Sequence, residues 1–299
     1  MGVFSKRKAA RSTMSCIPPP RILRAVKINV LEVSRMELQK LHYAVADGVA
    51  TITMDYGKNL NAIDDQMADE LLFLLAEAEK DDAVKVILLN SAAKAFSAGG
   101  DIGFFYQLVK AGGEINMDSL IGKVGKITNG MKSSKKMIVA AVNGAAAGAG
   151  FPLALSADFI VADEKAMFIL AFVNLGLVPD TGAAYLLCKS IGEKRTMKYA
   201  ATGKPIKADE ALALGLVEKV VPPEELAAES MKLAKKFVAG PLVSYTNIKK
   251  QIYAASFSDY ERFLDGTENP TQHECSNTED FKEGCAAFME KRKPAFQGK

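Results

Sequence analysis

Two glycine-rich turns hold the residues of this sequence that are best suited to chemistry. One is Ala95–Ile102, which shortly follows an apolar stretch, and the other is Asn143–Gly150, between a stretch of strand character and one of helical character. Glycine allows positive φ and lets a ligand approach the main chain closely. A turn that opens a helix leaves N–H groups unpaired where the helix dipole favours negative charge. Two such turns facing each other would hold one oxyanion; the alternative is that both are packing corners.

Other chemistries of glycine-rich turns fit the spacing less well. Leu153 occupies the third glycine position of a dinucleotide-binding fingerprint, and no Walker lysine follows either turn. Ser97 is a poor nucleophile candidate, because a nucleophile elbow needs glycine two residues earlier, where Ala95 stands.

Composition narrows the function classes further. The chain has two histidines, which argues against a Ser-His-Asp triad or a histidine-rich metal site. Its four cysteines show no CxxC spacing and are predicted to be reduced thiols in a cytosol-like compartment. Residues 1–35 carry a charge of +7, which leaves −4 for residues 36–299 out of a net +3. The body is therefore mildly acidic, and DNA is not expected as a partner.

The hydrophobic pattern predicts an α/β body that positions these turns. Two strands alternate around Asp47–Gly48, a hairpin signal. Further strands are predicted over 84–89, 137–142, 158–161 and 217–221, and helices over 64–80, 181–190 and 223–238. Strands that alternate with helices indicate parallel pairing.

From residue 240 the pattern is helical. Leu242, Tyr245, Ile248 and Ile252 share one helical stripe, and Ser276–Glu279 resembles a capping box before a last helix. We therefore divide the chain into a basic extension over 1–36, a core over 37–239 and a helical region over 240–299, and expect the last to cover a neighbouring subunit.

No stretch of the sequence is predicted to cross a membrane. Met137–Ser156 is 20 residues without a charge, but half of these are Ala or Gly, so buried elements are predicted rather than a span.

The extension over 1–36 is not expected to join the fold. It is interpreted as a disordered arm, as a transit peptide, or as residues upstream of a start at Met36. Cytoplasmic localisation is expected, or the mitochondrial matrix if the extension is a transit peptide.

With these motifs in view, residues 41–299 resemble the crotonase superfamily, the enoyl-CoA hydratase/isomerase family. The resemblance rests on the order and spacing of seven segments. They are Asn59–Ile63, Ala95–Ile102, Ala140–Gly144 with the following turn, Gly176–Asp180, Ala201–Gly203, Ala213–Val217 and Phe288–Pro294. It implies a spiral of ββα units with a helical C-terminal trimerisation region. It also implies a homotrimer or hexamer that acts on acyl-CoA thioesters in fatty acid metabolism, with acyl-CoA as substrate and with no metal or separate cofactor.

The resemblance also implies a site. The main-chain N–H groups of Gly100 and Ala149 would hold the thioester oxygen as it becomes an enolate. Ala149 stands where relatives usually have glycine, which would cost about 1–2 kcal/mol if its φ were positive. Substrate and CoA contacts are implied for Lys58, Leu60, Ala98, Asp101, Ile102, Phe172, Phe288 and Lys291. Asp101 is also interpreted as an acceptor that stabilises its turn.

The sequence departs from the hydratase pattern at both catalytic glutamates, where it has Pro152 and Phe172. Asp180 remains, at a position where some isomerases of the family have a working carboxylate. A single acid/base is enough for a 1,3-proton shuttle, so a double-bond isomerase is favoured. The alternative interpretation of Asp180 is a cap for the helix over 181–190.

Other functions stay open at this point. They are a weakened hydratase, a decarboxylase, or a non-catalytic scaffold that binds CoA esters or RNA. The loop over 103–118, with Phe104, Phe105, Tyr106 and Met117, is expected to shape the acyl pocket.

Overall fold

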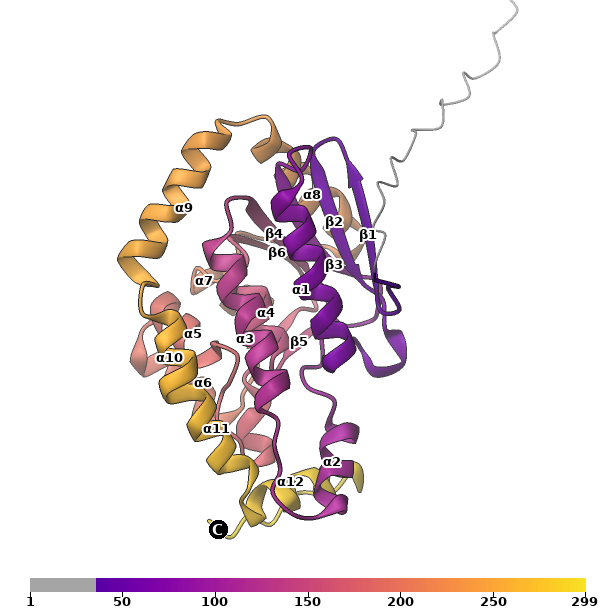
Figure 1. Ribbon diagram of the computed structural model, residues 1–299, viewed down its shortest axis with the longest axis vertical. Helices are drawn as coiled ribbons and strands as arrows, with labels where there is room; N and C mark the ends of the chain where they lie inside the picture. The colour runs from indigo at the N-terminus through magenta and orange to yellow at the C-terminus, as the bar shows by residue number, and fades with distance from the viewer. Residues whose placement is uncertain (1–35) are drawn as a thin grey trace, which may run out of the picture.

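The chain folds into two sheets that are enclosed by helices (Figure 1). The structure is a computed structural model and describes residues 36–299, so nearly all of the predicted N-terminal extension lies outside it. The strands are β1 Leu41–Ala46, β2 Val49–Met54, β3 Val86–Ser91, β4 Met137–Val142, β5 Ala145–Ala147, β6 Phe159–Asp163, β7 Met167–Ile169, β8 Ile206–Lys207 and β9 Lys219–Val221. The helices are α1 Asp65–Lys80, α2 Ile102–Ala111, α3 Asp118–Ser133, α4 Gly150–Leu155, α5 Ala183–Ile191, α6 Glu193–Thr202, α7 Ala208–Ala213, α8 Leu226–Val238, α9 Leu242–Ser256, α10 Tyr260–Phe263, α11 Asn269–Ser276 and α12 Glu279–Met289. Short turns of other helix types are η1 Gly57–Asn59, η2 Ala171–Leu175, η3 Pro223–Glu225 and η4 Leu264–Glu268, the last of them π-helical.

The larger sheet has the order β1-β2-β3-β4-β6-β9, and every neighbouring pair after the β1–β2 hairpin is parallel. The smaller sheet, β5-β7-β8, pairs β5 with β7 in parallel and β7 with β8 antiparallel. The hairpin turn has positive φ at both central residues, 52° at Asp47 and 79° at Gly48, as the Asp-Gly signal predicts. The α/β class and the parallel pairing expected from the sequence are confirmed.

The central strands of the larger sheet, β3, β4 and β6, are buried on both faces, which explains their continuous apolar runs. Along β4, Ile138 and Ala140 enter the main core, whereas Met137 and Val139 pack with Phe237 of α8 in a second core. Because side chains alternate along a strand, one apolar run serves both cores. In Figure 1, α1 and α3 lie side by side over one face, while α8 covers the other.

Four local predictions from the sequence are wrong. Residues 102–111 form α2, not part of a loop, because the Asp101 carboxylate caps that helix by accepting the Phe104 N–H at 3.1 Å. The last helix begins at Glu279 and its N-cap is Thr278 rather than Ser276. The helix expected from residue 181 begins two residues later, after Gly182, and Asp180 is not its side-chain cap.

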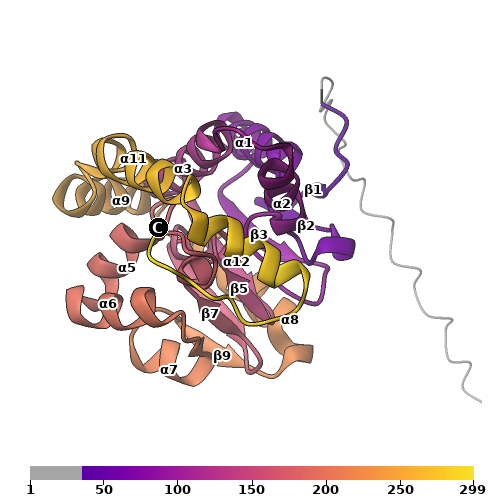
Figure 2. The same cartoon turned by 90° about the horizontal axis from the view of Figure 1, so that it is seen from below.

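The C-terminal helices run along one side of the body and then across its lower end (Figures 1 and 2). Helix α12 lies beside α2 and η2, and it approaches η2 very closely. A Cβ on Gly284 would lie 2.7 Å from the Leu175 Cα, so only glycine fits at this crossing. Helix α12 therefore packs against η2 and against α2, the helix that directly follows the first glycine-rich turn.

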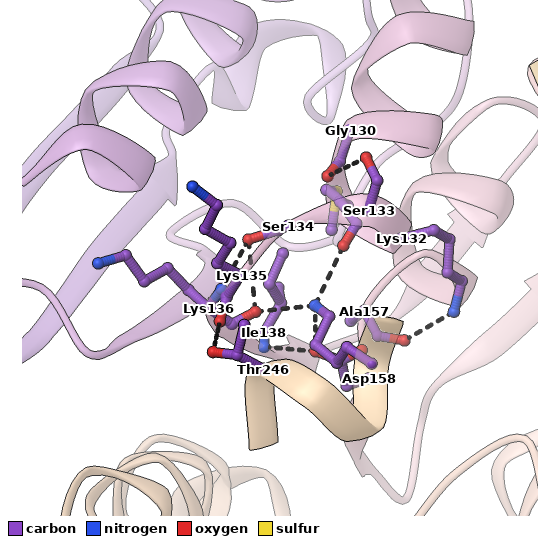
Figure 3. Close-up of polar contacts among 12 residues, drawn as sticks. Gly130, Lys132, Ser133, Ser134, Lys135, Lys136, Ile138, Ala157, Asp158 and Thr246 are labelled. Atoms are coloured by element: carbon purple, nitrogen blue, oxygen red, sulfur yellow. Dashed lines mark hydrogen bonds and ion pairs between the residues drawn. The ribbon is translucent and has the colours of Figure 1, made fainter. Parts of the chain in front are cut away.

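Helix α9 is attached to the body by polar groups and by the Tyr245 ring, which packs edge-to-face against Phe237 of α8. The Thr246 hydroxyl donates to the Lys135 carbonyl at 2.8 Å, beside Asp158, which accepts the Ile138 N–H (Figure 3). Lys249, the one buried residue of α9, donates to Asp158 Oδ2 at 2.7 Å.

Only part of the apolar stripe predicted on this helix packs within a single subunit, since Tyr245 contacts the second core and the two isoleucines do not. Ile248 and Ile252 are 47% and 52% exposed. The expected trimer or hexamer stays a prediction. Within residues 36–299, no helix is both long enough and apolar enough to cross a bilayer.

Candidate active site

A single apolar pocket brings the two glycine-rich turns together with Asp180. Its empty space, with the opening to solvent included, amounts to about 580 Å³. Its walls come from both turns, from α2, α3 and η2, and from the segment before α5. The lining residues are Ile63, Ala98, Gly100, Ile102, Phe105, Leu120, Ile121, Val124, Gly148, Ala149, Ala171, Phe172, Leu175, Leu177, Asp180 and Thr181. Such a pocket suits an apolar substrate that carries one polar group.

The two turns are in main-chain contact. A Cβ on Gly99 would lie 2.7 Å from the Ala147 carbonyl oxygen and 3.2 Å from the Ala149 nitrogen. Gly99 also has a φ of +90°, so both its conformation and its surroundings require glycine. A Cβ on Gly150 would lie 2.7 Å from that of Ser97. The missing side chains thus allow the turns to meet.

Hydrogen bonds from Asn61 hold the first turn in place. Its side-chain amide donates to the Phe96 carbonyl at 3.1 Å and to the Ser91 hydroxyl at 2.8 Å. The Ser97 hydroxyl in turn donates to the Asn61 carbonyl at 2.7 Å. Ser97 is fully buried and committed to this network, which agrees with its rejection as a nucleophile. The sequence analysis did not predict that Asn61 holds the first turn in place. Asn61 has a φ of 55°, and asparagine is one of the few residues that adopt this conformation readily, so its place in a turn motif was the available signal.

Gly100 and Ala149 both line the pocket, and their N–H groups are free. Among the described residues, neither N–H donates a turn, capping or side-chain hydrogen bond. Ala149 has a φ of −61° and a ψ of −20°, so alanine is unstrained there and the cost considered for a positive φ does not arise. A Cβ on Gly100 would lie 2.6 Å from the Phe105 ring, so a larger residue there would require that ring to move.

Asp180 is buried in the pocket wall and is held by one of its two oxygens. Gln272 of α11 donates to Oδ2 at 2.8 Å, while Oδ1 has no hydrogen-bond partner. Burial raises the pKa of Asp180 to about 7, and the hydrogen bonds from Gln272 and Thr181 oppose that rise. A carboxyl with its pKa near neutrality is suited to take and return a proton.

A second buried carboxyl, Glu268, stands close to Asp180. Its Oε1 accepts the Gly182 N–H at 2.8 Å, so it caps the approach to α5 in place of Asp180. Burial first, and then the charge of Asp180, raise the pKa of Glu268 to about 9. Glu268 and Gln272 escaped the sequence analysis because both come from the C-terminal helices, far from the motifs. Their four-residue spacing, which places both on one helix face, was the available signal.

The other residues implied by the resemblance divide into two groups. Ala98, Ile102 and Phe172 line the pocket. The remaining five stand outside its lining and are Lys58, Leu60, Asp101, Phe288 and Lys291. Of the two positions that lack glutamate, Phe172 faces the pocket and Pro152 is buried in α4 outside the lining.

Comparison with known proteins agrees with this architecture. Residues 44–299 match the family model described as enoyl-CoA hydratase/isomerase. The chain is 36% identical to a trans-2-decenoyl-[acyl-carrier-protein] isomerase of Streptococcus mutans, over 88% of this chain and 100% of that protein. It is 33% identical to a 1,2-epoxyphenylacetyl-CoA isomerase of Escherichia coli, over 85% and 97%. The crystal structure of an enoyl-CoA hydratase from Mycobacterium avium subsp. paratuberculosis superposes with a TM-score of 0.79 at 31% identity, covering 87% of this chain and 100% of that one.

The chain therefore belongs to the enoyl-CoA hydratase/isomerase family and has the crotonase fold. The resemblance drawn from seven short segments is confirmed. Relatives named as isomerases and as hydratases are both similar to it, so the family alone does not choose the reaction.

Proposed function

We propose that this protein is an enoyl-CoA double-bond isomerase in which Asp180 is the single acid/base. One observation carries the proposal. Of the described residues that line the pocket, Asp180 is the one with a titratable side chain, and its Oδ1 has no partner. The two relatives named as isomerases, one for a decenoyl-[acyl-carrier-protein] and one for an epoxyphenylacetyl-CoA, give further support for thioester isomerisation.

The first step removes a proton from C2 of a 3-enoyl thioester. The C–H electron pair moves toward the thioester carbonyl, whose oxygen becomes an oxyanion, and the proton passes to Asp180 Oδ1. The N–H groups of Gly100 and Ala149 stabilise this oxyanion. Preorganised donors of this kind contribute about 3–4 kcal/mol each in comparable enzymes.

The second step returns the same proton to the substrate. Asp180 protonates C4, the electrons of the dienolate reform the thioester carbonyl, and the double bond ends between C2 and C3. Atoms and electrons balance without water or a cofactor. A pKa near 7 suits Asp180 to both directions of transfer, because neither its acid nor its base form is strongly favoured at neutral pH.

Hydration would require more than this pocket lining offers. Water has to be activated at C3 while a proton is delivered at C2, and the family's hydratases divide this work between two glutamates. Here Phe172 lines the pocket at one of those positions, and Pro152 at the other has neither a proton to give nor a side-chain acceptor. The lining is apolar elsewhere, so a water molecule finds few polar partners in it.

The test compares three reactions of one preparation. Wild-type protein is assayed with 3-enoyl-CoA for double-bond migration, with crotonyl-CoA for hydration and with a malonyl-type thioester for decarboxylation. We expect migration to dominate and Asp180→Asn to lower its kcat by about 10²–10⁴-fold. Asp209→Asn, an exposed aspartate outside the pocket lining, is the matched control. Equal rates for wild type and Asp180→Asn, or faster hydration than migration, would refute the proposal.

A further inference from the structure

Three buried oxygen atoms around Asp180 have no hydrogen-bond partner. They are Asp180 Oδ1, Glu268 Oε2 and Gln272 Oε1. All three side chains are almost fully buried, with residue exposures of 7%, 2% and 1%. Native structures leave few buried polar atoms unsatisfied, so a group of three in one place calls for an explanation. Oδ1 has one under the proposed function, because it faces the substrate.

Glu268 has no cation to balance a negative charge. Its Oε1 accepts the Gly182 N–H, and no lysine, arginine or histidine among the described residues forms an ion pair with it or with Asp180. Tyr260 of α10 is the other titratable neighbour, and its hydroxyl donates to Thr128 of α3 at 3.0 Å. A buried, unpaired carboxylate beside a second carboxylate is strongly unfavourable, so one of the two stays neutral.

The charged groups of α11 do not change this balance. His273, next to Gln272, faces outward and contacts Asp118 at 3.1 Å and Glu114 at 3.0 Å. The positive charge of that histidine is therefore already matched by two carboxylates on the far side of α11. The difference between Asp180 and Glu268 is set by their own surroundings. The Asp180 carboxyl accepts a hydrogen bond from the side chain of Gln272, while the Glu268 carboxyl accepts one from a single main-chain donor, the Gly182 N–H.

Glu268 also fixes the turn that carries Asp180. Thr181 has a φ of 54° and Gly182 a φ of 88°, so two successive residues adopt the left-handed region. That conformation is unfavourable for threonine, and it persists when surrounding contacts over-determine it. The hydrogen bond from the Gly182 N–H to Glu268 is one such contact. Tyr260 is another, because its hydroxyl would lie 1.7 Å from a Cβ on Gly182.

We propose that Glu268 is a second carboxyl of this site that stays protonated, and that Glu268 and Gln272 position Asp180 so that Oδ1 alone meets the substrate. The inference rests on the proposed function, because it assigns Asp180 as the base. Both are positioning residues: Glu268 holds the Asp180–Gly182 turn without adding charge, and Gln272 occupies Oδ2. The proton in transit therefore goes to Oδ1 and never to Glu268.

Two conservative variants separate this role from a merely structural one. Glu268→Gln keeps an acceptor for the Gly182 N–H and the neutral charge. We expect kcat at pH 7 to stay within about threefold of wild type. Wild type is expected to lose activity above about pH 9, where Glu268 ionises, and the variant is expected to keep its activity there. Gln272→Met removes the donor to Asp180. We expect the acidic limb of the kcat profile to move up by about one pH unit.

Controls are chosen outside the cluster. Glu261→Gln on α10 and Gln251→Met on α9 change the same residue types at exposed positions and should leave both limbs in place. A uniform fall in kcat at every pH with unmoved limbs would mean that Gln272 is only structural. Loss of activity in folded Glu268→Gln at pH 7 would mean that the enzyme needs an ionised Glu268. Either result overturns the proposal.

Infrared difference spectra test the protonation state without any turnover. The difference of wild type minus Glu268→Gln at pH 7 should contain a protonated-carboxyl band, and the difference of wild type minus Asp180→Asn should titrate near pH 7. A carboxylate band from Glu268 at pH 7 overturns the inference. If both spectra behave as expected but no thioester is isomerised, the proposed function fails while the arrangement of the two carboxyls stands.

Discussion

Gly99 of the first turn lies directly against Gly148 of the second, since a Cβ built on Gly99 would be 3.1 Å from the Gly148 Cα. This contact brings two peptide N–H groups from separate parts of the chain to one pocket. The chemistry proposed here requires both donors at once. Under the proposed function, stabilisation of the oxyanion therefore depends on this contact. A substitution that adds one methyl group at Gly99 tests that dependence.

Gly99→Ala should separate the two turns. The added methyl meets the Ala147 carbonyl oxygen at 2.7 Å, and the φ of +90° disfavours any side chain. Loss of one aligned oxyanion donor costs about 10²–10³-fold in kcat, and we expect a fall of that size. Gly113→Ala is the control, because Gly113 has a similar φ of +83° but nothing within 4 Å of its Cβ position. If both variants lose activity equally, backbone strain rather than separation of the turns is responsible.

Ala149→Gly should leave catalysis almost unchanged. Ala149 already adopts a φ of −61°, which suits any residue, and the substitution keeps the N–H. Loss of an oxyanion donor lowers kcat by about 10²–10³-fold, and we expect the change here to be far smaller. Steady-state kinetics with 3-enoyl-CoA measure this. A large gain in activity would show that the methyl group obstructs the oxyanion and that glycine is functionally required.

The rate of isomerisation should depend on the ionisation of Asp180. Its pKa is raised to about 7, mainly by burial, and the ionised form is the proton acceptor. We expect kcat to rise with pH up to about 7 and to level off above it. A profile of kcat against pH, recorded from about pH 5 to about pH 9 with saturating substrate, measures this. A profile that is flat below pH 7 would mean that another group removes the proton.

Stability should fall as pH rises, because two buried carboxyls must ionise on unfolding. The pKa of Asp180 increases from 3.8 to about 7 on folding and that of Glu268 from 4.5 to about 9. Between each pair of values the folded state binds more protons than the unfolded state, so the free energy of unfolding decreases with pH. Glu268→Gln removes one of these contributions. We expect a gain of about 4 kcal/mol at pH 8 relative to its effect at pH 4.5, measured by urea denaturation. The exposed Glu261→Gln should show no such difference.

The sequence predicted the parts of the site that depend on local chemistry. Two glycine-rich turns, one between a buried strand and a helix, are visible in the chain because close main-chain approach needs glycine. The central strands of the larger sheet are visible because burial on both faces makes them apolar, and its first two strands are visible because they alternate around an Asp-Gly turn. Asp180 stands out as the remaining carboxyl next to apolar residues. These signals are all local or periodic.

What the sequence did not predict depends on contacts between distant segments. The sequence predicts a loop over 103–118, whereas residues 102–111 form α2, whose Phe105 lines the pocket and contacts Phe281 of α12. Glu268 and Gln272 lie about 90 residues after Asp180 in the chain, with Gln272 separated from it by 92 positions. No spacing rule relates them to Asp180. The same holds for Lys249, whose burial no helical stripe indicates.

Lys249→Met should destabilise the protein more than its helix position suggests. The ammonium group donates to Asp158 Oδ2 at 2.7 Å and to the Lys136 carbonyl at 2.8 Å, and it is almost fully buried. Removing one partner of a buried ion pair leaves the other charge unbalanced, which costs about 3–5 kcal/mol. Urea denaturation measures the loss, and Lys250→Met, at the exposed neighbouring position, is the control. Equal stability of the two variants would mean that water reaches Asp158 and that α9 does not depend on this ion pair.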